Sequence, residues 1–348
     1  MDISLFDYYL PKELIAQEPV EPRDHSRLMV LNRKDKTIIH TYFYKIIDYL
    51  NQNDVLVFNN SKVVPARLLG HKKNTNGKAE ILLIRPENKE FFDFSFWPLF
   101  WRAIGKPELQ EGQIIVFDNG LEAKVIKKEN YEISIQFNYK GEELKNKILK
   151  IGQMPLPPYI DHPTERSFKE YQTVYAKQEG SIAAPTAGLH FTQKLLKKIE
   201  TKGVQLEFVV LHVGLGTFLP VKENEIEKHQ MHSEYFVIPE DTAQRLNRAK
   251  QKGKRIISVG TTVARVLETC SNESGELEAK SGWTNLFIYP GYNFKFIDAL
   301  ITNFHLPKST LLMLVSALAG REFILKAYQE AIKERYRFFS FGDAMFIT

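Results

Sequence analysis

Five of the nine histidines stand in or beside segments rich in glycine, asparagine or threonine, namely His190, His212, His229, His232 and His305. Histidine changes its charge near neutral pH, so each is a candidate for proton transfer as well as for a structural position. The chain has no H-E-x-x-H motif and no pair of cysteines, and His229 and His232 lack a carboxylate partner in a zinc pattern. We therefore expect no metal site.

Small residues dominate residues 181–192, which read Ser-Ile-Ala-Ala-Pro-Thr-Ala-Gly-Leu-His-Phe-Thr and precede an expected helix. Small residues let a backbone approach a ligand closely, and the unbonded N–H groups at a helix start favour an anion or a polar head group. A tight, crowded turn between two elements is equally compatible with this composition.

Residues 211–220, Leu-His-Val-Gly-Leu-Gly-Thr-Phe-Leu-Pro, begin like the dinucleotide fingerprint G-x-G-x-x-G. Leu219 stands where the third glycine belongs, and Pro220 follows instead of a long helix. A Rossmann cofactor loop is therefore not expected. A nucleoside triphosphate is not supported either, because Gly77 and Lys78 are followed by alanine and lack the spaced upstream glycine of a Walker motif.

A third segment, residues 255–265, runs as an expected strand through Gly260 into a helix whose first turn carries Thr261 and Thr262. Either threonine is suited to cap that helix. The same geometry can hold a carboxylate or phosphate, which makes Arg265 a candidate partner for an anion.

Two clusters of basic residues stand out against a mild net charge of +5. Residues 244–255 hold six basic side chains and no acidic one, and Lys194, Lys197, Lys198 and Lys202 lie close together elsewhere. Each cluster fits a solvated helix face, and each also fits a surface that contacts nucleic acid. The charge balance leaves both a small-molecule enzyme and an RNA-binding protein open.

The composition, with 43% hydrophobic and 26% charged residues over 348 positions, is that of an ordinary globular protein. The lone Cys270 favours a reducing compartment, and the first ten residues lack a signal peptide's basic start and apolar run. The most continuous apolar run, residues 310–319, is too short to span a bilayer. We expect a cytoplasmic protein without a membrane segment.

The hydrophobic pattern divides the chain into two kinds of structure. Short alternating apolar runs at 79–84, 113–117, 122–126 and 132–137 predict a small all-β barrel over residues 67–152. The aromatic run 91–101 within it is interpreted as core or inter-domain packing, with base stacking as the alternative.

Residues 1–66 and 153–348 predict an α/β domain with a mixed sheet, interrupted by the barrel. Its expected strands are 27–31, 54–58, 204–213, 255–259, 284–289 and 343–347, and its expected helices are 44–50, 192–202, 241–252, 261–270 and two within 308–337.

The chain resembles the S-adenosylmethionine:tRNA ribosyltransferase-isomerases, enzymes of queuosine biosynthesis. The similar stretches are 6–11, 65–67, 154–160, 171–176, 184–191, 212–218, 302–307 and 341–345, among them Ala-Pro-Thr-Ala-Gly-Leu-His-Phe at 184–191 and Thr-Asn-Phe-His-Leu-Pro at 302–307. Residues 59–62 depart from the family, reading Asn-Asn-Ser-Lys where Asn-Asp-Thr-Arg is usual, and Val263-Ala264 replaces a more usual Ser-Val. The resemblance implies an α/β main domain with a β-barrel insertion, in agreement with the hydrophobic pattern.

The resemblance also implies a reaction. The ribosyl group of S-adenosylmethionine moves to 7-aminomethyl-7-deazaguanine at the tRNA wobble position, giving epoxyqueuosine with release of adenine and methionine. S-Adenosylmethionine is consumed, so no further cofactor is expected, and the partner is tRNA carrying the precursor in its anticodon loop. We expect a monomer. An S-adenosylmethionine-dependent methyltransferase and a non-catalytic RNA-binding protein are the alternatives.

Such a reaction needs a base for a proton beside the sulfonium, an acid for the departing adenine and an uncharged accepting amine. We assign proton transfer to His190 and His305, with His212 and Glu234 in reserve. The expected substrate-binding residues are Pro185, Thr186, Ala187, Gly188, Gly214, Gly216, Thr217, Gly260, Thr261, Thr262 and Asn303, with Arg265 or Arg67 for the methionine carboxylate or tRNA phosphates. Basic residues 245–255 are a candidate phosphate-contacting face, because the wobble base lies in a single-stranded loop.

Overall fold

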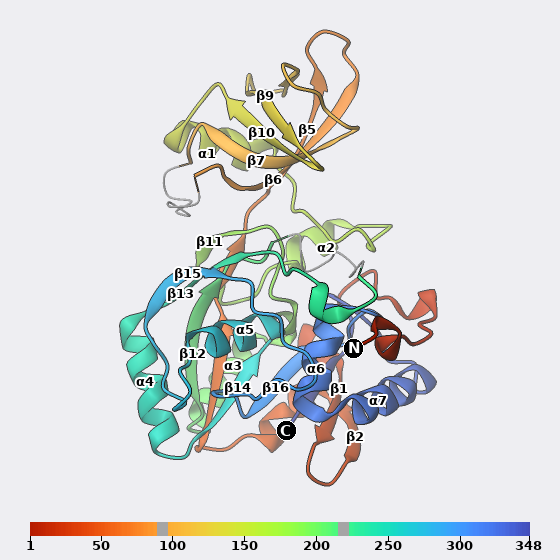
Figure 1. Ribbon diagram of the computed structural model, residues 1–348, viewed down its shortest axis with the longest axis vertical. Coiled ribbons are helices and arrows are strands. Elements are labelled where there is room, and N and C mark those ends of the chain that lie inside the picture. The colour runs from red at the N-terminus through yellow and green to blue at the C-terminus, as the bar shows by residue number, and fades with distance from the viewer. Residues whose placement is uncertain (89–96, 215–222) are drawn as a thin grey trace. The chain divides into compact units, whose positions relative to one another are not determined.

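The computed structural model describes residues 1–88, 97–214 and 223–348 and divides into two compact units, drawn in Figure 1. The larger unit comprises Met1–Ser61, Pro158–Lys177 and Ala184–Thr348, and the barrel unit comprises Lys62–Pro157 and Gln178–Ala183. The larger unit has a mixed sheet and the other a closed β-barrel. The predicted fold class, an α/β domain with an inserted small barrel, is confirmed.

The described part of the larger unit contains a nine-stranded sheet. Its order is β15 (Lys280–Thr284), β13 (Glu234–Ile238), β12 (Gln205–Leu211), β3 (Asp54–Asn59), β14 (Arg255–Val259), β16 (Ala299–Asn303), β17 (Ala344–Ile347), β1 (Arg27–Asn32) and β2 (Thr37–Tyr42). The central strands β12, β3, β14 and β16 are mutually parallel, and β17 pairs with β1 in parallel. The two ends of the chain therefore lie side by side, as the red and blue strands of Figure 1 show.

The helices of this unit follow the sheet strands in the alternation that the sequence predicts. They are α2 (Glu165–Glu170), α3 (Gln193–Thr201), α4 (Glu240–Gln251), α5 (Thr261–Cys270), α6 (Thr310–Ala319) and α7 (Arg321–Lys333). Short 3₁₀ helices are η1 (Ile3–Phe6), η2 (Lys12–Leu14), η3 (Arg23–His25), η4 (Phe43–Tyr49), η5 (Thr186–His190) and η7 (Ile226–Lys228). No helix in the described ranges is both long enough and apolar enough to cross a membrane.

One face of the sheet is covered by α3 and η4. Leu195, Leu196 and Ile199 of α3 and Phe43 and Ile46 of η4 belong to one buried cluster with alternate residues of the central strands. The residues between them point to the opposite face, because side chains alternate along a strand. Helix α5 contacts β3, β12, β14 and β16 and covers that second face. The parallel strands are therefore buried on both sides, as their continuous apolar sequences require.

The barrel unit closes a six-stranded antiparallel barrel around its own core. Its order is β10 (Glu132–Phe137), β7 (Phe100–Lys106), β6 (Lys78–Pro86), β5 (Arg67–Lys72), β8 (Ile114–Val116) and β9 (Glu122–Glu129), and α1 (Gly141–Ile151) follows. Strand β11 (Gln178–Ser181) pairs with β4 (Ser61–Val63), which brings a late segment of the chain into this unit. Trp97 and Trp101 are completely buried with ring centroids 5.4 Å apart, as packing aromatics would be. Residues 91–96 of the same aromatic run lie outside the described residues.

The predicted strand at 284–289 is wrong, because the strand at this edge is β15, which ends at Thr284. The backbone beyond it is bonded to side chains: Arg265 Nε donates to the carbonyl of Leu286 at 3.0 Å, and the N–H of Leu286 donates to the Thr284 hydroxyl at 3.2 Å. The sequence analysis also missed β2, β13 and β16 and the helix α1. The predicted helix at 44–50 forms as the 3₁₀ helix η4.

Candidate active site

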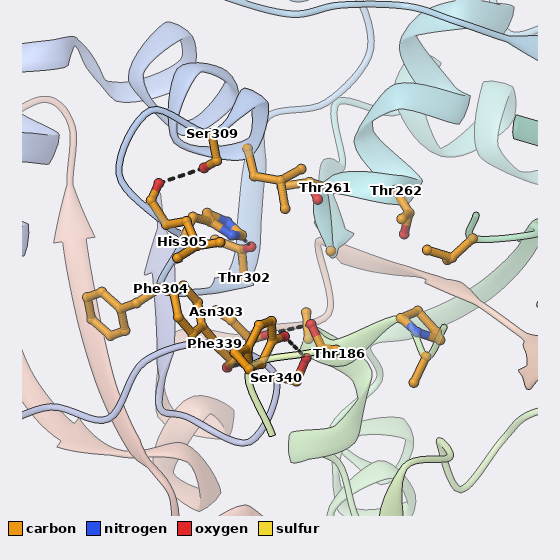
Figure 2. A pocket seen from close by; sticks show the side chains of 18 residues that line it. Thr186, Thr261, Thr262, Thr302, Asn303, Phe304, His305, Ser309, Phe339 and Ser340 are labelled. Carbon is orange, nitrogen blue, oxygen red and sulfur yellow. Dashed lines mark hydrogen bonds between the residues drawn. The ribbon is translucent and has the colours of Figure 1, made fainter. Parts of the chain in front are cut away.

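A pocket opens in the larger unit where the parallel strands β12, β14 and β16 end, at the carboxyl edge that binds ligands in open α/β sheets. It holds about 680 Å³ of space between protein atoms, including solvent at its mouth. The lining residues are Tyr159, Ala184, Pro185, Thr186, Ala187, Val213, Gly260, Thr261, Thr262, Thr302, Asn303, Phe304, His305, Leu306, Ser309, Leu311, Phe339 and Ser340. Figure 2 shows the hydroxyls and the His305 ring gathered around this space.

Asn303, the last residue of β16, is held in the pocket wall by three hydrogen bonds of its side-chain amide. Its amide nitrogen donates to His190 Nε2 at 3.1 Å and to the carbonyl of Phe339 at 3.0 Å. Its amide oxygen accepts from the Thr186 hydroxyl at 3.0 Å, a bond drawn in Figure 2. On the far side, His190 Nδ1 bonds the Ser26 hydroxyl at 2.7 Å.

These bonds determine the tautomer of His190. An amide N–H can only donate, so Nε2 accepts and the ring proton lies on Nδ1, directed at Ser26. Burial, together with the charges of Arg23 and Arg337, lowers the pKa of His190 to about 3. The ring is neutral near pH 7, both nitrogens are occupied, and His190 is not among the pocket-lining residues. It stands behind Asn303 and orients it.

His305 occupies the turn after β16 and does line the pocket. The backbone N–H of His305 donates to the Tyr328 hydroxyl at 2.9 Å, and its backbone carbonyl accepts from the Tyr8 hydroxyl. Its Nε2 bonds the Thr302 hydroxyl at 2.9 Å. Burial lowers the pKa of His305 to about 3, so the imidazole is neutral near pH 7.

The start of α5 forms another wall of the pocket. Neither Thr261 nor Thr262 caps the helix, because Gly260 is the N-cap residue, at φ 95°, and no side chain bonds the first turn. Such a φ favours glycine, so this sharp entry into the helix depends on Gly260. Within the described part of the chain, the Thr262 hydroxyl oxygen is buried without a hydrogen-bond partner. A free helix start and an unbonded hydroxyl in one pocket wall are suited to bind a polar ligand.

Arg265 and Glu234 form a buried ion pair with 4% of each residue exposed. Glu234 also accepts from the N–H of Gly214 at 2.9 Å, and Arg265 donates to the Leu286 carbonyl at 3.0 Å. Neither charged residue lines the pocket. The pair connects α5, β13 and the chain after β12, which assigns it to holding these segments together.

The remaining predicted residues fall into four groups. His212 is buried and stacked on Tyr235 at 6.1 Å, and burial lowers its pKa to about 4; it does not line the pocket. Gly188 packs so tightly on Tyr175 that a Cβ atom would stand 1.9 Å from the phenol oxygen, so its small size serves packing. Arg67 belongs to the barrel unit and pairs with Glu80 at 2.8 Å. Gly216 and Thr217 lie outside the described residues.

Several pocket residues were missed from sequence. Tyr159 bonds the Ser340 hydroxyl and packs on Phe339 with ring centroids 4.7 Å apart. Ser309 donates to the Leu306 carbonyl at 2.7 Å and caps α6. A signal for Tyr159 was present, because it falls inside the family-like stretch 154–160. In the described ranges no cluster of three or more histidine, cysteine, aspartate or glutamate side chains is arranged to hold a metal.

The fold and the pocket define an α/β enzyme whose site lies at the carboxyl edge of a mixed sheet and whose sequence is interrupted by a β-barrel. The model of the queuosine biosynthesis protein family matches residues 3–347, and the chain belongs to this family. Its full-length relatives are named as ribosyltransferases, which makes it an enzyme of the transferase class.

Similar proteins match over their whole length. The S-adenosylmethionine:tRNA ribosyltransferase-isomerases of Sulfurihydrogenibium sp. strain YO3AOP1 and Desulfitobacterium hafniense strain DSM 10664 / DCB-2 are each 51% identical, with 100% of both chains covered. Among solved structures, S-adenosylmethionine tRNA ribosyltransferase from Thermotoga maritima is 40% identical and has a TM-score of 0.57. The match covers 99% of this chain and 100% of that one.

Proposed function

We propose that this enzyme transfers and isomerises the ribosyl group of S-adenosylmethionine onto 7-aminomethyl-7-deazaguanine at the wobble position of tRNA. The products are epoxyqueuosine-tRNA, adenine and methionine. The observation that carries the proposal is full-length 51% identity to two proteins named for ribosyl transfer from S-adenosylmethionine to tRNA. S-Adenosylmethionine is consumed as a co-substrate, and the proposal includes no other cofactor.

The donor is assigned to the pocket at the carboxyl edge of the sheet. Thr261 and Thr262 at the uncapped start of α5 and the fixed amide of Asn303 offer polar contacts, while Pro185 and Ala187 provide a small apolar wall. A bound donor that bonds the Thr262 hydroxyl would satisfy a group that is otherwise buried without a partner in the described chain. Thr262 is therefore the residue whose hydrogen bonding supports the donor site most directly.

Proton transfer is assigned to His305, because it is the histidine that lines the pocket. The sulfonium acidifies the protons on the adjacent ribose carbon, and the neutral imidazole of His305 is available to accept one. His190 supports the reaction by holding Asn303, rather than by exchanging protons with substrate. The Asn303–Thr186 bond then fixes the segment that carries Thr186 relative to the turn that carries His305.

The proposed enzyme acts as a monomer in the cytoplasm. Cys270 is the one cysteine of the sequence, which fits a reducing compartment. Burial raises the pKa of its thiol to about 12, as for a structural thiol. Light scattering on the purified protein tests the monomer, and localisation of a tagged chain in cells tests the compartment.

The deciding experiment measures products. The purified enzyme is incubated with S-adenosylmethionine and tRNA bearing the deazaguanine precursor, and the small molecules are separated by chromatography. Free adenine and free methionine in equal amounts support the proposal. Appearance of S-adenosylhomocysteine identifies a methyltransferase instead, and tRNA binding with no donor consumption identifies a non-catalytic RNA-binding protein.

A further inference from the structure

One face of α3 is a stripe of lysines. Lys194, Lys197 and Lys198 stand at i, i+3 and i+4, so they share one side of the helix, while Leu195, Leu196 and Ile199 are buried on the other. The three lysines are exposed, and none of them has a carboxylate within 4.0 Å among the described residues. With Ile47, Thr201 and Lys202 they border a surface hollow. Like charges at these spacings repel and destabilise the helix, so the stripe is not explained by stability.

The second basic cluster is partly paired with carboxylates. Arg245 is paired with Glu207 and Asp241, each at 2.8 to 2.9 Å. Lys250 is paired with Asp298 at 3.0 Å, and Arg255 with Asp54 at 2.8 Å. These carboxylates neutralise half of the six basic side chains at 244–255. Three of its basic side chains, Arg248, Lys252 and Lys254, remain without a carboxylate in the described structure, as many as on the α3 stripe, so unpaired charge alone does not distinguish the two clusters.

Exposed aromatic rings stand on η4 and just before it, and η4 contacts α3. Tyr42, which ends β2, and Tyr44, in η4, are 48% and 36% exposed and stack with ring centroids 5.8 Å apart and planes at 10°. His25 packs edge-on against Tyr44 at 5.0 Å. The same η4 contributes Ile47 to the lysine-lined hollow. Flat exposed rings next to lysines match the combination that proteins use to bind single-stranded nucleic acid, in which bases stack and phosphates pair with cations.

A chain of buried hydrogen bonds connects the segment beside this surface to the wall of the pocket. His25 precedes Ser26, which bonds His190, and His190 holds Asn303 in the pocket lining. Thr192, the N-cap of α3, bonds Asp24 of η3 at 2.9 Å, which ties the first turn of the lysine helix to the same segment. The amino end of α3, the two tyrosines and the pocket thus meet at one edge of the sheet.

We infer that His25, Tyr42, Tyr44, Lys194, Lys197 and Lys198 form the surface that binds the anticodon arm of the tRNA. The lysines contact its phosphates and the tyrosines stack on a loop base next to the base that enters the pocket. Glu200 is the one acidic residue on α3, and it follows the stripe toward the end of the helix that is farther from the pocket. The inference rests on the proposed function, because it takes the RNA substrate from it.

The test compares two triple variants with equal loss of charge. One carries Lys194→Gln, Lys197→Gln and Lys198→Gln. The matched control carries Arg248→Gln, Lys252→Gln and Lys254→Gln, from the other basic cluster. Affinity for a full-length tRNA transcript is measured by fluorescence anisotropy over a range of salt concentrations. Binding of S-adenosylmethionine by calorimetry and the melting temperature verify that each variant is folded.

We expect the α3 variant to raise Kd about tenfold or more and to flatten the slope of log Kd against log salt by about two units, since each phosphate contact contributes about 0.7 to 0.9. The control should bind like the wild type. Tyr44→Leu should raise Kd at least about fivefold, while Tyr44→Phe keeps the stacking face and the affinity.

Equal Kd and salt slope for the α3 variant and the wild type would overturn the inference, as would loss of binding in the control alone. Both results leave the proposed function intact if adenine and methionine are still released. A wild-type enzyme that fails to bind tRNA overturns the inference and the proposed function together.

Discussion

The amide nitrogen of Asn303 donates to Nε2 of His190 across 3.1 Å, and with the bond to Ser26 it occupies both nitrogens of this buried ring. It leaves His190 as an acceptor on one side and a donor to Ser26 on the other, with its ring closed off from the pocket. His305, two residues beyond Asn303, faces the pocket instead. A network of this kind is sensitive to every member, because removing one leaves buried partners without hydrogen bonds.

Replacing His190 by leucine should lower both activity and stability. Leucine leaves the Asn303 amide and the Ser26 hydroxyl without their partner, at a cost of about 1 to 3 kcal/mol for a buried group. We expect a lower melting temperature and a lower kcat for adenine release. His190→Gln supplies an acceptor near the position of Nε2 and should recover most of both losses. Equal defects in the leucine and glutamine variants would contradict a role in orienting Asn303.

Replacing His305 by alanine should lower kcat by about 10² or more, the usual contribution of general acid–base catalysis. The affinity for S-adenosylmethionine and for tRNA should change little, because the side chain acts on the reacting atoms. Rapid-quench measurement of adenine release in a single turnover separates this chemical step from binding. A variant that retains wild-type single-turnover rates would remove His305 from the proton transfer.

The fold was largely readable from the sequence because its hydrophobic patterns are regular. Alternating runs predicted the barrel, and the strand–helix alternation predicted the mixed sheet. Strand β16, Ala299–Asn303, was missed because it is short and ends in a threonine and an asparagine, and asparagine is rare in strands. Strand β13 begins with Glu234, a residue that rarely starts a buried strand; here Arg265, far along the chain, neutralises it.

The residues of the candidate site could be predicted from the sequence only in part. The small-residue segment and the Thr-Asn-Phe-His stretch both line the pocket, as local composition suggested. The position of His190 behind Asn303 depends on Ser26, which is 164 residues away in sequence, so no local pattern could indicate it. The expected threonine cap on α5 does not form, because the N-cap position is occupied by Gly260, which has no side chain.

Replacing Thr262 by valine should weaken donor binding. Valine keeps the shape of the side chain and removes the hydroxyl that is proposed to bond S-adenosylmethionine. A net hydrogen bond of about 0.5 to 1.5 kcal/mol predicts a rise in donor Kd of about two- to tenfold. Calorimetric titration measures it, and Thr201→Val on the exposed end of α3 is the matched control. Because this hydroxyl is buried without a partner among the described residues, the Thr262→Val enzyme should be at least as stable without donor, and a lower melting temperature would indicate a structural bond instead.

Acid should destabilise the enzyme well above the range in which carboxylates titrate. Burial lowers the pKa of His190 and His305 to about 3 and that of His212 to about 4, whereas an unfolded histidine titrates near 6.5. Between these values the unfolded chain binds protons that the folded chain does not, so the free energy of unfolding rises with pH and is lost as the pH falls below 6.5. Each of the three histidines should contribute about 1 kcal/mol of loss at about pH 5.5.

Urea unfolding at pH 7.5, 6.5 and 5.5 measures this loss. Asp343 acts in the opposite direction, because burial raises the pKa of its carboxyl and stabilises the fold at lower pH, so the measurements stay above pH 5. His212→Phe removes one titrating ring while keeping an aromatic side chain against Tyr235, and its stability should fall less steeply between pH 6.5 and 5.5 than that of the wild type. Parallel curves for the two proteins would mean that His212 is not held neutral in the folded state.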